Sequence, residues 1–220
     1  MKFICVIFGL CLYTPVTNAK MLKVAVIDTG IDFTVLDKVP LCKDGHKSFT
    51  KDNTLKDRND IQHGTNIVGL IAKYSDNSNY CIIIIKFYDK QQNSFALGKA
   101  ISYAATLDVD IVNISAGGAG FDDNEKVGIE RLLTKNVIVV SAAGNDKQNL
   151  DYSCYFYPAC YDKRIIVVGA TNVWQANTGS IIDVKESGYK EVGTFGRPLS
   201  GTSQATAIYT GKLIKRLSSK

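Results

Sequence analysis

The sequence predicts a three-layer α/β/α fold with a mostly parallel central sheet. Several short runs are almost continuously apolar and rich in β-branched residues, which is typical of strands buried on both faces of a parallel sheet. These runs alternate with longer stretches whose apolar residues recur at helical spacing. The chain has 220 residues, 45% of them hydrophobic, so it is long enough for one domain with a single core.

The expected elements alternate along the chain. The expected strands are residues 23–28, 81–87, 111–115, 137–142 and 165–170. The expected helices are residues 63–74, 94–107, 124–135 and 202–217. Ser94 is expected to cap the second helix, and the polar residues 37–62 are expected to form a surface loop. Ligands of such sheets bind at the carboxyl ends of the strands, so functional residues are expected there.

The first nineteen residues have the pattern of a secretory signal peptide. Lys2 is followed by an apolar run over residues 3–13, and small residues stand at Thr17 and Ala19. The alternative is a membrane anchor, but the apolar run is too short to span a bilayer. We therefore expect cleavage after Ala19, a secreted chain (extracellular or periplasmic), and a single domain over residues 20–220.

The charged residues give a formal net charge of +5 and are scattered rather than clustered. This distribution favours a solvated surface over nucleic-acid binding. We expect no membrane association after signal cleavage, and a monomer.

Four of the six cysteines lie beyond the predicted signal peptide: Cys42, Cys81, Cys154 and Cys160. An even number in an exported chain indicates two disulfides, and four cysteines allow three pairings. The short loop favours Cys154–Cys160, which leaves Cys42–Cys81. The spacing does not fit a structural zinc site, and no metal is expected.

Three residues stand at the ends of expected elements. Asp28 ends a buried strand, where a carboxylate is costly without a partner. His63 opens a helix among small residues. Ser203 lies at the start of the last helix, where backbone N–H groups and the helix dipole favour negative charge. Each of these residues alone is also typical of an ordinary turn or helix cap.

Together the three residues supply the groups that acyl transfer by serine requires. The hydroxyl attacks, a neutral imidazole removes its proton, and a carboxylate orients the imidazole and stabilises its charged form. Asp28, His63 and Ser203 are therefore a candidate catalytic triad, in the chain order Asp, His, Ser.

The motifs Asp28-Thr29-Gly30, His63-Gly64-Thr65 and Gly201-Thr202-Ser203 resemble those of the subtilisin (subtilase) family. The similar blocks are residues 24–31, 61–72, 111–118, 139–146, 157–170 and 199–208. The resemblance implies a subtilisin-like fold and a secreted serine endopeptidase. Such an enzyme would hydrolyse protein or peptide substrates through an acyl-enzyme on Ser203.

The resemblance also implies roles for residues around the triad. Asn145 corresponds to the family's side-chain donor to the oxyanion, and the Ser203 N–H would be the second donor. Ser115, Ala116 and Gly117 resemble the strand that pairs with the bound peptide. The opposite wall of the pocket for the side chain before the cleaved bond is formed by residues that correspond to Ala142, Ala143 and Gly144.

The chain departs from the family pattern in several places. Asn66 replaces a usual second histidine, Gln204 a usual methionine, and Ala207 a usual proline. Only residues 20–22 separate the predicted cleavage site from the first strand, so we expect a short form without a propeptide. Residues 74–79 replace what is often a longer calcium-binding loop, so no cofactor is expected; calcium stays possible but is not indicated.

Two other functions remain open from the sequence. A catalytically silent protein that binds peptides or a partner would fit the altered Gln204 and the absent propeptide. An aspartic protease would fit Asp28-Thr29-Gly30, but such enzymes need two neighbouring carboxylates, and the chain has one such motif and no all-β pattern.

Overall fold

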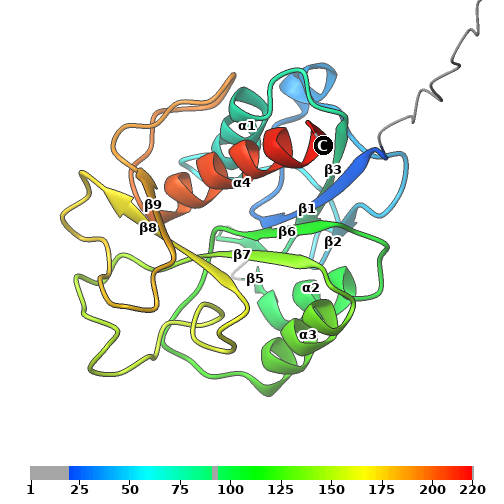
Figure 1. Cartoon of the computed structure of the whole chain (residues 1–220). Helices are drawn as coiled ribbons and strands as arrows, with labels where there is room; N and C mark the ends of the chain where they lie inside the picture. The colour runs from blue at the N-terminus through cyan, green and yellow to red at the C-terminus, as the bar shows by residue number, and fades with distance from the viewer. Residues whose placement is uncertain (1–19, 91–93, 220) are drawn as a thin grey trace, which may run out of the picture.

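The computed structural model describes residues 20–90 and 94–219 of the chain, so the predicted signal peptide lies outside the described residues. A seven-stranded sheet runs through the molecule in the order β2-β3-β1-β6-β7-β8-β9, and every neighbouring pair is parallel (Figure 1). The strands are β1 (Leu22–Asp28), β2 (Lys47–Ser48), β3 (Tyr80–Lys86), β6 (Ile111–Ile114), β7 (Ile138–Ala142), β8 (Ile166–Thr171) and β9 (Val184–Ser187).

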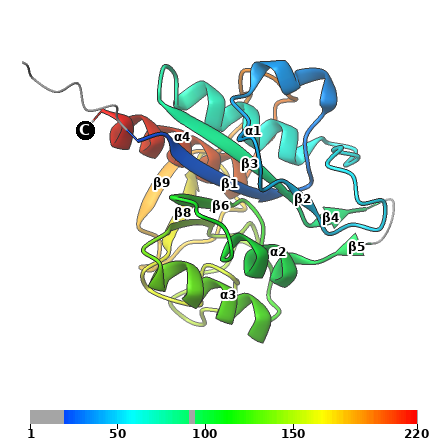
Figure 2. The ribbon, with the colours of Figure 1, turned by 90° about the vertical axis from the view of Figure 1, so that its right-hand side faces the viewer.

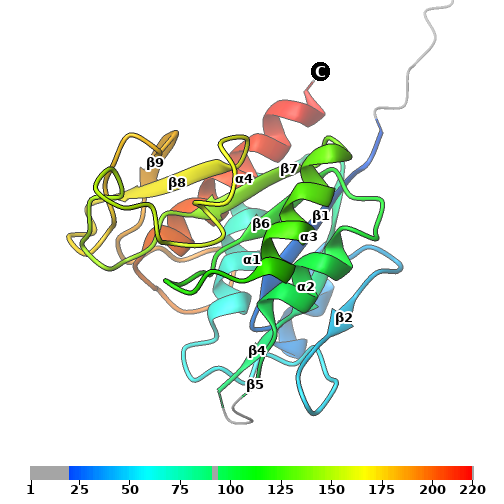
Figure 3. The ribbon, with the colours of Figure 1, turned by 90° about the horizontal axis from the view of Figure 1, so that it is seen from below.

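Helices cover both faces of this sheet. The helices are α1 (His63–Tyr74), α2 (Leu97–Ala104), α3 (Asp123–Thr134) and α4 (Thr202–Ser218). Helices α1 and α4 lie on one face, and α2 and α3 lie on the other (Figures 1 and 3). This arrangement confirms the predicted three-layer α/β/α fold.

Strand β1 shows why its sequence forms a central strand. Ala25 and Ile27 pack in the core with α2 and α3, whereas Val24 and Val26 pack in the core with α1 and α4. Successive side chains of a strand point to opposite faces, so an uninterrupted apolar run fills both cores at once. All four residues are at most 1% exposed.

The second predicted helix was wrong at its start. Ser94 does not cap a helix, because Ser94–Phe95 form strand β5, which pairs with β4 (Tyr88–Asp89) in an antiparallel hairpin (Figure 2). Helix α2 begins only at Leu97, after Ala96 donates its N–H to the Phe87 carbonyl at 2.9 Å. Hairpin pairing therefore takes the backbone groups that an earlier helix start would have needed.

The polar region 37–62 contains more structure than the sequence predicted. A 3₁₀ helix (Phe33–Lys38) enters it, and β2 lies within it as an edge strand beside β3. Strand β9, at the other edge of the sheet, was also not predicted. It is short and half-exposed and carries two charged residues, so it lacks the apolar run of a buried strand.

The structure places the four described cysteines in two pairs. The sulfurs of Cys42 and Cys81 lie 1.98 Å apart, and those of Cys154 and Cys160 lie 1.94 Å apart. This is the pairing that the sequence favoured. Within residues 20–90 and 94–219, no helix is both long enough and apolar enough to cross a membrane.

The strand order determines where a site can form. Strands β1, β6 and β7 are adjacent in the sheet, and their carboxyl ends therefore lie side by side. Asp28 is the last residue of β1, Ser115 follows β6, and Ala142 ends β7. Chain segments that are far apart in sequence thus meet at the carboxyl ends of these central strands.

Candidate active site

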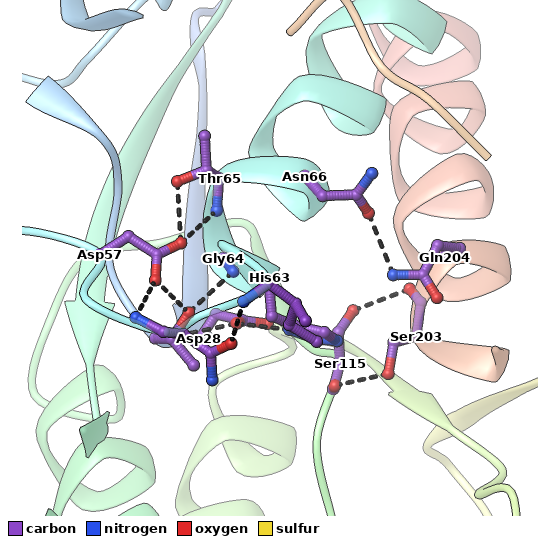
Figure 4. Close-up of polar contacts among 12 residues, drawn as sticks. Asp28, Asp57, His63, Gly64, Thr65, Asn66, Ser115, Ser203 and Gln204 are labelled. Atoms are coloured by element: carbon purple, nitrogen blue, oxygen red, sulfur yellow. Dashed lines mark hydrogen bonds and ion pairs between the residues drawn. The ribbon is translucent and has the colours of Figure 1, made fainter. Parts of the chain in front are cut away.

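Asp28 and His63 form a close, largely buried pair at the carboxyl end of β1. Asp28 is 2% exposed, and its Oδ1 accepts hydrogen bonds from the His63 Nδ1 at 2.7 Å and from the Thr29 N–H at 2.8 Å (Figure 4). A carboxylate only accepts, so the proton of the neutral imidazole is on Nδ1. The Nε2 atom is then free to accept a proton, which is the tautomer that a general base needs.

Two opposing effects act on the His63 imidazole. Burial lowers its pKa, but the charge of Asp28, the hydrogen bond to Asp28 and the charge of Asp57 together outweigh it. The pKa of His63 is therefore raised above its ordinary value of 6.5. His63 therefore takes up a proton more readily than an exposed imidazole does.

A second buried carboxylate, Asp57, organises the start of α1. The side chain of Gln62, the residue before this helix, makes no capping hydrogen bond. Asp57 caps the helix from the loop, because its Oδ2 accepts from the Thr65 N–H at 2.9 Å and from the Thr65 hydroxyl at 2.8 Å. Its Oδ1 accepts from the Thr29 hydroxyl at 2.9 Å, and that hydroxyl in turn accepts from the Gly64 N–H at 2.8 Å.

This network joins the segment after Asp28 to the segment after His63, as Figure 4 shows. Close packing requires glycine there, because a Cβ at Gly64 would collide with the Gly30 carbonyl oxygen. Sequence reasoning missed Asp57. The available signal was a helix start without a capping side chain and an acidic residue in the loop just before it.

Ser203 lies in the first turn of α4, directly beside the end of β6. Its hydroxyl donates to the Ser115 carbonyl at 2.8 Å, and the Ser115 hydroxyl donates to the Ser203 carbonyl at 3.0 Å (Figure 4). The Ser115 hydroxyl also accepts from the Asn113 Nδ2 at 3.0 Å. These bonds attach the start of α4 to the sheet and fix the position of the Ser203 backbone.

Asn145 is attached to the same turn of α4. Its Oδ1 accepts from the Thr202 N–H at 2.9 Å, and the Gly144 N–H donates to the Thr202 hydroxyl at 3.1 Å. The oxygen of the Asn145 amide is thereby engaged, and its Nδ2 group remains for another acceptor. Asn145 itself is exposed, so that acceptor can come from outside the protein.

Phe156 lies between the two segments that flank Ser203. A Cβ at Gly117 would be 2.5 Å from its Cε1 atom, and a Cβ at Gly144 would be 2.6 Å from its Cδ2 and Cε2 atoms. One side of the ring therefore faces Gly117 and the opposite side faces Gly144. Phe156 is 8% exposed. Sequence reasoning missed Phe156, because nothing near it in the chain indicates this position.

The structure therefore brings Asp28, His63, Ser203 and Asn145 to the carboxyl ends of the central strands. In this arrangement the Ser203 hydroxyl is bonded to Ser115. The predicted peptide-pairing residues 115–117 and the predicted wall 142–144 flank Ser203, with the Phe156 ring between them. Among the described residues, no group of three or more His, Cys, Asp or Glu side chains is arranged to hold a metal ion.

Comparison with known proteins identifies relatives over nearly the whole described chain. The model of the subtilase family matches residues 19–218. Subtilisin amylosacchariticus from Bacillus subtilis subsp. amylosacchariticus is 30% identical over 209 residues, which cover 86% of this chain and 53% of the relative. The major intracellular serine protease of Bacillus subtilis (strain 168) is 30% identical over 226 residues, which cover 89% of this chain and 68% of the relative.

A solved structure shares the fold. The crystal structure of a cold adapted subtilisin-like serine proteinase superimposes with a TM-score of 0.69 at 21% identity, covering 92% of this chain and 79% of that one. The present chain spans about half the length of Subtilisin amylosacchariticus.

Proposed function

Because this chain belongs to the subtilase family, we propose that it is a serine endopeptidase that cleaves peptide bonds through an acyl-enzyme on Ser203. The observation that carries the proposal is that three groups lie together at the carboxyl ends of the central strands. These are the Asp28–His63 pair, joined at 2.7 Å, and the Ser203 hydroxyl at the start of α4. Their types are those that acyl transfer requires, and their order along the chain is that of subtilisin.

The proposed reaction begins with a rotation of the Ser203 side chain. The hydroxyl leaves the Ser115 carbonyl and reaches Nε2 of His63, which takes its proton as the oxygen attacks the substrate carbonyl. Asp28 stabilises the imidazolium that results. The Ser203 N–H and the Asn145 Nδ2 donate to the oxyanion. The imidazolium then protonates the leaving amine, and water repeats the sequence on the acyl-enzyme.

The direct test is a fluorophosphonate probe on purified residues 20–220, read by intact mass and peptide mapping. We expect one adduct, on Ser203, because only an activated serine reacts at a useful rate. Labelling is expected to disappear on heat denaturation and in His63→Ala. Labelling of a different serine, or of none in the folded protein, would contradict the proposal.

The proposed base predicts the pH dependence of the reaction. Neutral His63 is the active form, so kcat/KM falls as pH drops through the pKa of His63. Since that pKa is raised, the inflection is expected above pH 6.5. In Asp28→Asn the charge of the carboxylate is lost while burial remains, so the pKa of His63 is expected to fall and the inflection to move to lower pH.

NMR titration of the imidazole signals checks this prediction independently of turnover. The chain has two histidines, His46 and His63, and the His63→Ala variant assigns the signals. The His63 titration midpoint should coincide with the kinetic inflection and move with it in Asp28→Asn. An inflection well below pH 5 would indicate carboxylate chemistry instead.

The segments on either side of Ser203 are the proposed peptide-binding walls. Gly118 is already paired with Tyr157, through N–H to carbonyl bonds of 2.9 and 2.8 Å. Ser115, Ala116 and Gly117 are therefore the part of this segment proposed to pair with an extended substrate. Ala142, Ala143 and Gly144 form the opposite wall, which the Thr202 hydroxyl holds beside the nucleophile.

Phe156 is proposed to restrict the residue whose carbonyl is attacked. The side chain of that residue would enter between the two walls, where the Phe156 ring contacts both Gly117 and Gly144. A large apolar side chain has no space there while the ring is in place. The proposed enzyme therefore prefers substrates with glycine, alanine or serine before the cleaved bond.

The Phe156→Gly variant tests this preference. Removing the ring opens a site for leucine or phenylalanine, whose full burial is worth about 1.5–3 kcal/mol. We expect kcat/KM for a substrate with leucine before the cleaved bond to rise about 10- to 100-fold relative to its alanine counterpart. The measurement compares matched fluorogenic peptides that differ only at that residue.

Phe49→Ala is the control, because Phe49 packs against the same core cluster beside Tyr103 of α2. It should lower stability without changing the ratio between the two peptides. A wild-type enzyme that already prefers leucine, or a ratio unchanged in Phe156→Gly, would contradict the role of Phe156.

We also propose that the mature chain is exported. Two cysteine pairs at disulfide distance support this proposal, because disulfides persist in oxidising compartments. The predicted signal peptide supports it from the sequence. Mass spectrometry of the protein recovered outside the expressing cells should give an N-terminus at Lys20, and retention of residues 1–19 on a cytosolic protein would contradict it.

A further inference from the structure

Two residues at which the chain departs from the family pattern, Asn66 and Gln204, are bonded to each other. The Gln204 Nε2 donates to the Asn66 Oδ1 at 3.0 Å (Figure 4). The two side chains are 0% and 1% exposed. A buried amide is costly unless its polar atoms are bonded, so this pairing makes the two unusual residues depend on each other.

Asn66 also binds a third segment of the chain. Its Nδ2 donates to the Glu191 carbonyl at 3.0 Å and to the Arg197 carbonyl at 2.7 Å. The loop between these carbonyls lies on α1, where the Thr194 N–H donates to the Gly69 carbonyl at 3.0 Å. One side-chain amide therefore joins α1, the loop that leads into α4, and α4 itself.

The location of the pair relates it to the proposed chemistry. Asn66 is one helical turn after His63 on α1, and Gln204 directly follows Ser203 on α4. We propose that Asn66 and Gln204 are positioning residues that fix the distance between the His63 imidazole and the Ser203 hydroxyl. This inference rests on the proposed function, because it assigns a role in aligning the same base and nucleophile.

The physical argument is that apolar packing restricts the register of two helices through shape alone, whereas a hydrogen bond adds a directional restraint. The packing of α1 on α4 is otherwise made largely by aliphatic side chains, whose attraction is non-directional. The Asn66 amide accepts on one side and donates twice on the other, so one orientation satisfies all three bonds. A misplacement of about 1 Å between reacting groups can reduce a rate about 100-fold.

Gln204→Met is the sharpest variant, because it removes the donor Nε2 and keeps the length of the side chain. The buried Asn66 Oδ1 would then lose its partner, so the contact between α1 and α4 beside it is expected to relax. We expect kcat to fall about 10- to 100-fold with KM changed less than about 2-fold. The rate of fluorophosphonate labelling of Ser203 should fall in parallel.

A double-mutant cycle with Asn66→Leu and Gln204→Leu tests the pairing itself. Gln204→Leu should lower kcat strongly in the wild-type background and little in the Asn66→Leu background. Leu132→Ala on α3 removes a fully buried side chain from the core on the opposite face of the sheet, and provides a destabilised control. Its kcat, measured where all variants are folded, should equal that of wild type.

Wild-type turnover in Gln204→Met, or additive losses of kcat in the cycle, would overturn the positioning role. If the wild-type protein neither hydrolyses peptides nor reacts with the probe, the proposed function itself fails. The two failures are distinguishable, because the first leaves an active wild-type enzyme and the second does not.

Discussion

Ser203→Ala is expected to lose about 10⁶-fold in kcat, the loss measured when subtilisin itself is deprived of its catalytic serine. The reason is that the hydroxyl is the proposed nucleophile, and the methyl group of alanine cannot attack the substrate carbonyl. The measurement is kcat on a chromogenic peptide, together with thermal unfolding. Residual activity near the wild-type level would contradict the assignment of Ser203.

The fold should survive this change. The Ser203 hydroxyl donates one bond, to the Ser115 carbonyl, and such a bond contributes about 1 kcal/mol. Ser200→Ala is the matched control, because it makes the same change three residues earlier. The Ser200 hydroxyl accepts from the Lys190 N–H at 2.8 Å and has no proposed part in the reaction, so this variant should keep full activity.

On the proposed function, Asn145→Ala is expected to lower kcat about 10²- to 10³-fold, which corresponds to about 2.7–4 kcal/mol and is the effect known for the side-chain oxyanion donor of subtilisin. KM should change little, because the oxyanion exists only on the way to the tetrahedral intermediate. Steady-state kinetics on one peptide give both constants. A loss confined to KM would indicate a role in ground-state binding instead.

Asn145→Asp separates the two tasks of this side chain. The variant keeps an oxygen that can accept from the Thr202 N–H, but it replaces the donor Nδ2 by a second oxygen. If Asn145 stabilises the oxyanion, Asn145→Asp should be at least as impaired as Asn145→Ala. Activity near wild type in Asn145→Asp would show that the residue serves only to accept a hydrogen bond from the start of α4.

The parts of the molecule that the sequence predicted are those determined by neighbours in the chain. Strand β1 and helix α1 were predicted to within one residue, because a continuous β-branched run and a helical spacing are local patterns. Asp28, His63 and Ser203 could be proposed because each stands at the end of such an element. Parallel strands then place those ends together.

The parts that could not be predicted depend on contacts across the fold. Gln204 bonds to Asn66 across 138 positions of sequence, so neither residue indicates the other. The Phe156 ring reaches Gly117 and Gly144 only after three loops have met. Ser94 was assigned to a helix on its capping propensity, which hairpin pairing with Tyr88–Asp89 overrides.

The order of the four proposed catalytic residues along the chain has a consequence for synthesis. The carboxylate, the base and the oxyanion donor belong to segments that leave the ribosome before α4, which brings the nucleophile. Helix α4 packs against β6, β7, β8 and β9 as well as α1, so it docks on a surface that those elements must already have built. On the proposed function, a growing chain is chemically inert until its sheet is complete. The proteolytic capacity of this domain then arises only when α4 docks on the finished sheet.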